Sequence, residues 1–347
     1  MLANAGTPLL WAGLFHLLIG NFIVGILEGL AVARLAKLRE GVCMCLMVVA
    51  NYLSAWVGVT WLFDPSSNLW SGVTIENLRW MLLIQVSAAF FWTVLAELPF
   101  MLVSSRFLSG TVKLGFARKM GVHFIVQFAS YLVLSLYFAM FSVTSALSSE
   151  VVPSSQLMPE NVRVLVLERE ESRVVEYGRD GNSFDLVSLE GVARKGDRLL
   201  VQPRPAGQWS IALVRRAGLN EQKVVFSVLD HVQEKHVPRN SSGVPSQWFT
   251  RAWDEQNHLG QGETEWTFYG DIWGNGIRAE SPRKTRQFGF SCPLFGWTCN
   301  EVTRLPNGVA VFRFGEDQIC LYDPETNRAA LLGRGTSVLP LLTQSGE

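Results

Sequence analysis

Hydrophobic and polar positions follow different patterns in the two parts of this chain. Four long stretches with almost no charged residue occupy positions 1–149, and the rest of the chain alternates apolar and polar residues over short distances. About 20 apolar residues in an α-helix cross the hydrocarbon core of a membrane, whereas alternation is typical of β-strands. The pattern predicts a four-helix transmembrane domain over 1–149, a linker over 150–160 and an all-β domain over 161–347.

The four apolar stretches cover positions 8–33, 41–63, 80–105 and 120–149. Glu28 and Glu97 are their only formally charged residues. Each stretch exceeds the roughly 18 residues that separate spanning helices from buried core helices. The chain start has neither a basic n-region nor a small-residue cleavage site, so we expect the first helix to be retained.

The positions of the basic residues predict how the helices cross the membrane. Short loops rich in Lys and Arg stay in the cytoplasm. The loop between the second and third stretches, on the opposite side of the membrane, has only one basic residue, Arg79, beside Asp64 and Glu76. The N-terminus and the β-domain are therefore expected outside the cytoplasm, in the periplasm if the chain is bacterial. The seven basic residues of the loops after the first and third stretches are Arg34, Lys37, Arg39, Arg106, Lys113, Arg118 and Lys119.

The formal net charge of zero narrows the list of partners. Neither part of the chain has the clustered basic surface that nucleic-acid binding requires, so no nucleic-acid partner is expected. The chain has no G-x-S-x-G elbow, phosphate-binding loop or dinucleotide fingerprint. We therefore expect no cofactor, and the sequence leans against an enzyme without settling the question.

Polar side chains inside an apolar helix are costly and often functional. Asn21, Gly25 and Glu28 share one face of the first helix. Gly25 and Gly29 also form a small-xxx-small pair, which allows close approach of another helix. A second polar stripe follows the fourth helix, at His123, Gln127, Ser130 and Tyr137.

Glu28, Glu97 and His123 are expected at similar depth, one or two turns from the cytoplasmic ends of three helices. They could share a proton or hold a cation, with Asn21 and Gln127 beside them. The alternative is that the carboxylates reach basic residues of the cytoplasmic loops while His123 caps its helix. A separate expectation is that other polar residues in the spans, His16 and Asn51, form hydrogen bonds between helices.

Strand-like runs and tight turns fill the second part of the chain, and the fold class is a sandwich, barrel or propeller-like array. Asn-Gly and Asp-Gly pairs predict tight turns at 180–181, 275–276 and 307–308. The predicted strands cover 162–167, 173–177, 198–202, 209–214, 223–228, 265–269, 309–314 and 318–322.

The tail over 305–341 resembles one blade of the six-bladed-propeller type of repeat. The resemblance lies in the run Gln-Ile-Cys-Leu-Tyr-Asp-Pro at 318–324 and in Leu332-Gly333. It implies a local strand-turn-strand unit, because no copies occur at a fixed period upstream.

The cysteines divide between the two parts of the chain. Cys43 and Cys45 lie in the second apolar stretch and are expected to pack as small apolar side chains. Cys292, Cys299 and Cys320 belong to the outward domain, where oxidation favours disulfides. The Cys292–Cys299 spacing suits a local disulfide, and three free thiols are the alternative. It does not suit a structural zinc site.

Two further groups of side chains stand out in the β-domain. One group of acids and histidines could assemble a metal site. No metal is expected, because the spacing of these residues matches no zinc motif and they are typical of solvated loops. The other is a dense aromatic segment that suits a core, or in part a ligand or partner surface. The first group is Asp230, His231, Glu234, His236, Asp254 and His258, and the second is Trp248, Trp253, Trp266, Phe268, Tyr269 and Trp273.

Three functions are compatible with these features. The β-domain could bind a protein or ligand while the helices anchor it in the lipid bilayer, as a subunit of a larger membrane assembly. The helices could instead form a transporter or a proton- or cation-handling protein that uses Glu28, Glu97 and His123. A membrane enzyme acting on a lipid or quinone needs only polar residues at a helix end.

Overall fold

The computed structural model describes eleven segments of the chain, which fall into two units. The first unit holds the helices up to Ser142, and the second holds most of the chain from Val143 onward together with Thr74–Glu76. We describe each unit by itself. The described residues are 15–62, 72–107, 115–168, 172–194, 196–217, 222–240, 243, 257–260, 264–270, 276–291 and 296–343.

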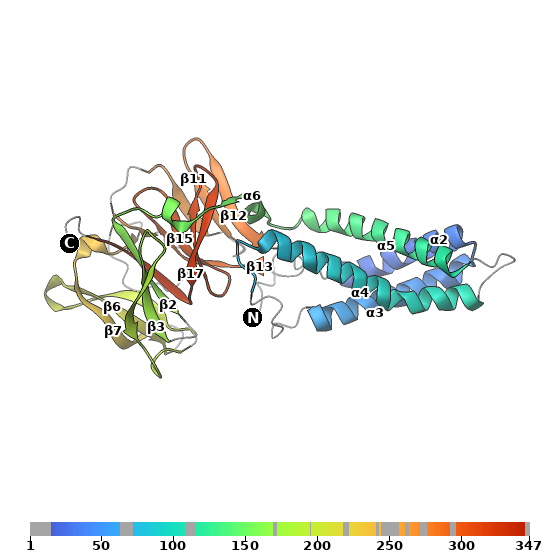
Figure 1. Ribbon diagram of the computed structural model, residues 1–347, viewed down its shortest axis with the longest axis horizontal. Coiled ribbons are helices and arrows are strands. Elements are labelled where there is room, and N and C mark those ends of the chain that lie inside the picture. Colours follow the sequence, from blue (N-terminus) through green and yellow to red (C-terminus); the bar gives the residue numbers. More distant parts are fainter. Residues whose placement is uncertain are drawn as a thin grey trace. The chain divides into compact units, whose positions relative to one another are not determined.

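Long apolar helices, α2 to α5 in Figure 1, make up the first unit. Three segments are long and apolar enough to cross a membrane: His16–Ala36, Leu78–Val103 and Ala117–Ala139. The apolar part of α3 described with its side chains, Glu40–Trp56, is shorter. Three of the four predicted spans are thus found among the described residues. The helices are η1 His16–Gly20, α2 Asn21–Ala36, α3 Glu40–Leu62, α4 Leu78–Phe107 and α5 Phe116–Ala139.

This unit buries polar side chains and exposes apolar ones. On α5, Leu132 and Leu136 are more than half exposed, whereas His123 and Gln127 are buried. Water would penalise both choices, but lipid would stabilise them because its tails are apolar. The described helices therefore have the polarity of a membrane bundle. The buried polar residues are Asn21, Glu28, Asn51, Glu97, His123 and Gln127.

The two glycines of α2 lie against α3. A Cβ atom on Gly25 would lie 2.6 Å from the Val48 Cα, and one on Gly29 would lie 2.5 Å from the Met44 Cα. Real Cβ contacts are never so short, so only glycine fits there. The close approach predicted for this small-xxx-small pair occurs, and α3 is the partner helix.

The fourth helix is shorter than predicted. α5 ends at Ala139, and the four-residue helix α6, Ser145–Ser148, follows a turn. Two serine hydroxyls of this segment donate to nearby backbone carbonyls, Ser142 to Phe138 and Ser148 to Ser145, both at 2.8 Å. The strand β1, Glu150–Val151, then pairs in parallel with β17 at the start of the predicted linker.

Four β-sheets form the second unit, with strand orders β1-β17-β16-β15-β14-β9-β8, β10-β11-β12-β13, β18-β2-β3-β4 and β5-β6-β7. The β-rich prediction is confirmed. The strands after β1 are β2 Val162–Glu168, β3 Arg173–Tyr177, β4 Ser183–Ser188, β5 Arg198–Pro203, β6 Trp209–Arg216, β7 Gln222–Val232, β8 Arg239–Asn240, β9 Asn257–His258, β10 Thr267–Gly270, β11 Gly276–Glu280, β12 Thr285–Ser291, β13 Gly296–Trp297, β14 Cys299–Arg304, β15 Ala310–Phe314, β16 Gln318–Asp323, β17 Arg328–Arg334 and β18 Ser337–Leu342.

The sheets stack through three apolar contacts, because successive residues of a strand point to opposite faces. In β2, Val164 packs toward the seven-stranded sheet, and Leu165 packs toward the β5-β6-β7 sheet. On the other face of the seven-stranded sheet, the Phe288 ring of β12 lies 5.6 Å from that of Phe312 and 4.7 Å from that of Tyr322. Both faces of the central sheets are therefore buried.

Several strands follow the predicted runs closely. The strand β18 was not predicted, and its sequence shows why. Pro340 interrupts its pattern, and proline cannot donate a ladder hydrogen bond. β18 is an edge strand paired only with β2 in its sheet, so one side of its backbone makes no ladder there.

Gly181 and Gly308 have positive φ angles of 76° and 83° in the predicted turns, while Asn275 lies outside the described residues.

The tail forms part of the hairpin unit that the propeller resemblance implies. β15, β16 and β17 make an antiparallel meander. The next strand, β18, leaves that sheet and pairs with β2. The segment 305–341 is therefore not one four-stranded blade.

Candidate functional site

The side chains of Glu28 and Glu97 meet at Gln127 inside the helical unit. Gln127 Nε2 donates to Glu97 Oε2 at 2.5 Å and to Glu28 Oε2 at 3.2 Å. The two acceptor oxygens can therefore be no more than 5.7 Å apart. This arrangement joins α2, α4 and α5, because Glu28, Glu97 and Gln127 are all buried between the helices.

Helix α3 completes this group. Asn51 Nδ2 donates to Glu28 Oε2 at 2.6 Å, and Ser54 Oγ donates to Glu97 Oε1 at 2.8 Å. Asn51 and Ser54 are three residues apart and share a helix face. Ser130 of α5 also hydrogen-bonds to the Glu28 side chain. We call Glu28, Asn51, Ser54, Glu97, Gln127 and Ser130 the carboxylate cluster.

The carboxylate cluster contains two acids and no described base. Glu28 is 2% exposed and Glu97 is fully buried. Neither forms an ion pair with any lysine, arginine or histidine of the described residues. Two neighbouring carboxylates cannot both stay ionised in such a place without a compensating charge. The geometry is suited to a shared proton or to a small cation held by oxygen atoms.

The carboxylate cluster lies deeper in the bundle than the sequence suggests. Glu28 precedes the end of α2 by about 12 Å, and Glu97 precedes the end of α4 by about 15 Å, at 1.5 Å per residue. These distances are two to three turns rather than one or two. They approach half of the roughly 30 Å hydrocarbon thickness.

His123 and Asn21 are buried but make other contacts. His123 Nε2 lies 3.2 Å from the Val94 carbonyl oxygen, and Asn21 Nδ2 donates to the Leu17 carbonyl at 3.4 Å. Among the described residues, no hydrogen bond or ion pair joins either side chain to Glu28 or Glu97. The structure thus brings together three of the five residues singled out from the sequence.

The alternative in which the acids reach toward the loops does not match the described contacts. Arg34 pairs with Glu40 at 3.4 Å, and both side chains are exposed. Glu28 and Glu97 point instead to amide and hydroxyl groups. The side chain of Arg106 lies outside the described residues.

Asn51 was expected to bond between helices, which it does, but its carboxylate partner and Ser54 were not identified from the sequence. Their i, i+3 spacing was the available signal. A single Asn and Ser in an apolar helix do not reveal which neighbour they face. That depends on how α2, α3 and α4 pack.

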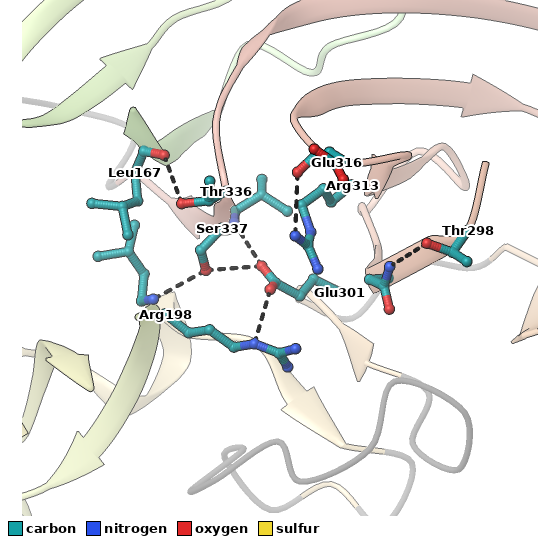
Figure 2. A network of polar contacts seen from close by, with 11 residues as sticks. Leu167, Arg198, Thr298, Glu301, Arg313, Glu316, Thr336 and Ser337 are labelled. Carbon is teal, nitrogen blue, oxygen red and sulfur yellow. Dashed lines mark hydrogen bonds and ion pairs between the residues drawn. The ribbon is translucent and has the colours of Figure 1, made fainter. Parts of the chain in front are cut away.

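The side chain of Glu301 in the β-domain is only 9% exposed (Figure 2). Its Oε2 accepts from Ser337 Oγ and from the Val338 backbone N–H, both at 2.8 Å, and Arg198 Nε lies 3.6 Å from Oε1. Ser337 Oγ accepts in turn from the Leu199 N–H at 3.0 Å. Glu301 therefore ties together β14, β18 and β5, which belong to three sheets.

The backbone of Glu301 explains how this side chain reaches inward. Its φ angle is +57°, in the left-handed region that few residues other than glycine adopt. The pairing of β14 with β15 also shifts between Asn300 and Thr303, as at a β-bulge. The bulge turns the carboxylate toward the neighbouring sheets, and we interpret this network as structural.

The described side chains among those that could have assembled a metal site make other contacts in the structure. Glu234 pairs with Arg239 at 3.3 Å, Asp230 pairs with Arg204 at 3.3 Å, and His231 Nδ1 lies 2.8 Å from Gln208 Oε1. Asp254 lies outside the described residues. Within the described segments, no group of three or more such side chains could hold a metal ion.

The cysteine and aromatic predictions are only partly covered by the structure. Cys292 lies outside the described residues, no disulfide is found among the others, and the Cys292–Cys299 bridge is not supported. Cys320 is fully buried, and burial raises the pKa of its thiol well above the ordinary value. Trp266 and Phe268 are buried in the core and Tyr269 is exposed. Trp248, Trp253 and Trp273 lie outside the described residues.

Comparison with known proteins identified no family for this chain. No family model, curated protein or solved structure matches this chain.

Proposed function

We propose that the helical unit spans a membrane and binds a proton or a small monovalent cation at the carboxylate cluster. The observation that carries this proposal is the Gln127 amide held between Glu28 and Glu97, which have no basic partner within the described part of the chain. A buried pair of acids without a compensating base is costly for a purely structural role. Exchange of a proton or cation at the two acids would explain why they are buried despite this free-energy cost.

The proposed arrangement has four spanning helices with the β-domain outside the cytoplasm. α3 is 23 residues long, which corresponds to about 34 Å, and its Asn51 and Ser54 face the same cluster as the other three helices. The orientation rests on the seven basic residues of the two loops expected in the cytoplasm against one on the other side.

Proton flux into proteoliposomes under an imposed membrane potential tests the function. The Glu97→Gln variant keeps the shape of the side chain but cannot release a proton, so we expect at least a tenfold loss of flux. The matched control is Glu40→Gln, an exposed acid at the loop end of α3, which should not change the flux. Flux that is absent in the unmodified protein, or equal in both variants, would contradict the proposal.

The same preparation distinguishes a proton from a cation. Flux that depends on sodium or potassium and falls as protons compete would identify a cation. Flux that persists without either ion would identify a proton. Isotope-edited infrared spectra of carboxyl groups would show whether Glu97 carries a proton at rest, because its signal disappears in Glu97→Gln.

Accessibility labelling tests the topology. A cysteine at Thr111 should react only from the cytoplasmic side, and one at Asn240 only from outside. Labelling at Asn240 from the cytoplasm would contradict the orientation without affecting the argument about the carboxylate cluster.

A second candidate function is binding of a protein partner by the β-domain, within a larger membrane assembly. The observation in its favour is Phe184, which is 63% exposed on the edge strand β4. Edge strands offer unpaired backbone groups to a partner. In native membranes, Phe184→Ser should reduce the size of the complex on blue native gels, and an unchanged size would contradict this candidate. No observation in the described residues favours the lipid or quinone enzyme.

A further inference from the structure

Three basic side chains stand in one row across neighbouring strands of the seven-stranded sheet. Arg239 of β8 pairs directly with His258 of β9, and His258 pairs with Arg304 of β14. Directly paired residues point to the same face of a sheet, and strands are about 4.8 Å apart. We call Arg239, His258 and Arg304 the basic row.

Arg239 and Arg304 flank His258 on both sides, and their charges disfavour its protonated form, so the basic row needs a reason. One explanation is that charges on edge strands prevent sheets from aggregating. That explanation covers Arg239, because β8 is the edge strand. It does not cover Arg304, because β14 lies inside the sheet between β9 and β15.

The described residues provide little negative charge against the basic row. Arg239 pairs with Glu234 at 3.3 Å, and both side chains are partly exposed. Arg304 Nη1 donates to the Trp266 carbonyl oxygen at 3.1 Å and has no ion-pair partner in the described segments. Burial lowers the pKa of the Arg304 guanidinium. A partly buried cation without a counter-charge is costly.

His258 is affected by the same shortage of negative charge. Burial lowers its pKa, and so do the charges of Arg304 and Arg239. The imidazole is therefore neutral near pH 7 when the site is empty. An anion bound between the two arginines would favour the protonated ring and add a third donor.

We propose that the basic row binds a phosphate-type dianion, either free phosphate or the phosphomonoester head of a lipid. Two guanidinium groups and one imidazole provide several N–H donors on one face, and guanidinium groups bind tetrahedral oxyanions in a forked geometry. The two arginines and a protonated His258, opposed by Glu234, carry two positive charges, which match a dianion better than a single carboxylate. The site is independent of the carboxylate cluster.

Titration of the full-length protein with inorganic phosphate tests this inference. The protein is held in phosphatidylcholine nanodiscs at constant ionic strength, and the imidazole signals of His258 are followed by NMR. We expect a saturable shift, with Arg304→Gln weakening the apparent affinity at least tenfold. The control is Arg328→Gln, which alters an exposed arginine of β17 in the same sheet that pairs with Glu150, and it should bind phosphate as the unmodified protein does.

A second arm distinguishes the two sources of the anion. Nanodiscs that contain phosphatidic acid should shift His258 without added phosphate if the ligand is a lipid head, and should leave it unchanged if the ligand is soluble. Either result supports the site. It would be overturned if neither phosphate nor phosphatidic acid shifts His258, if chloride at equal ionic strength shifts it equally, or if Arg328→Gln weakens binding as much as Arg304→Gln.

Discussion

The two units solve the burial of polar groups in opposite ways. The helical unit places amide and carboxyl groups inside and leaves leucine, valine and phenylalanine exposed, whereas the β-domain buries phenylalanine and valine between its sheets. Both arrangements follow from the surroundings, since lipid accepts apolar side chains that water rejects. An identical substitution should therefore have unequal effects in the two units.

The largest effect is expected from removing a core aromatic ring of the β-domain. Phe312 is fully buried between two sheets, so Phe312→Ala should lower the free energy of unfolding by about 3–5 kcal/mol. Phe22 of α2 is half exposed, and Phe22→Ala should cost less than about 1 kcal/mol in a bilayer, because lipid replaces its contacts. Thermal unfolding in nanodiscs measures both. Equal losses would contradict the membrane assignment of α2.

The next effect concerns the Glu301 carboxylate of the β-domain. Glu301→Ala removes the acceptor of the Ser337 hydroxyl and the Val338 N–H, and leaves Arg198 without its acid. Hydrogen bonds to charged groups contribute about 1.5–3 kcal/mol, so we expect a loss of that size in chemical unfolding. Glu316→Ala changes an exposed acid nearby and should have little effect. Similar losses in both variants would mean that Glu301 does not join the sheets.

A loss of stability similar to or smaller than that of Glu301→Ala is expected from a substitution where α2 contacts α3. Gly29→Ala places a methyl group where the Met44 backbone stands, and overpacking of this kind costs about 1–3 kcal/mol. At Gly41 an added Cβ meets nothing within 4 Å, so Gly41→Ala should be neutral or slightly stabilising. Detergent resistance on heating would compare the two. A tolerant Gly29 would indicate that the helices pack less closely than described.

The smallest effect is a change in proton binding at His258. Its pKa lies below the ordinary 6.5 because of burial, Arg304 and Arg239, so the folded state binds fewer protons than the unfolded state. The β-domain should therefore lose stability as the pH falls below about 6.5. Arg304→Gln should raise the pKa of His258 and reduce this loss, as an NMR titration would show. A pKa unchanged by Arg304→Gln would show that Arg304 does not act on His258.

The carboxylate cluster shows which part of a site the sequence can predict. Glu28, Glu97 and Gln127 stand out because charged and amide groups in apolar helices are costly wherever those helices pack. His123 has the same property, yet it bonds to the Val94 carbonyl instead. Ser54 attracts no notice in the sequence and still donates to Glu97. The free-energy cost of a polar side chain in an apolar helix identifies candidate site residues, but the side chains that they contact depend on how the helices pack.

The sequence by itself determined the two-part architecture, the apolar helices and the β-rich character of the second part, because these follow from local composition and from periods of 3.6 and 2 residues. Only the tertiary structure decided which side chains meet. The departure of β18 from its neighbouring meander, the inward turn of Glu301 at a bulge and the alignment of Arg239, His258 and Arg304 all depend on pairing between distant segments. Local composition and periodicity describe each segment by itself, and they do not say which distant segments will pair.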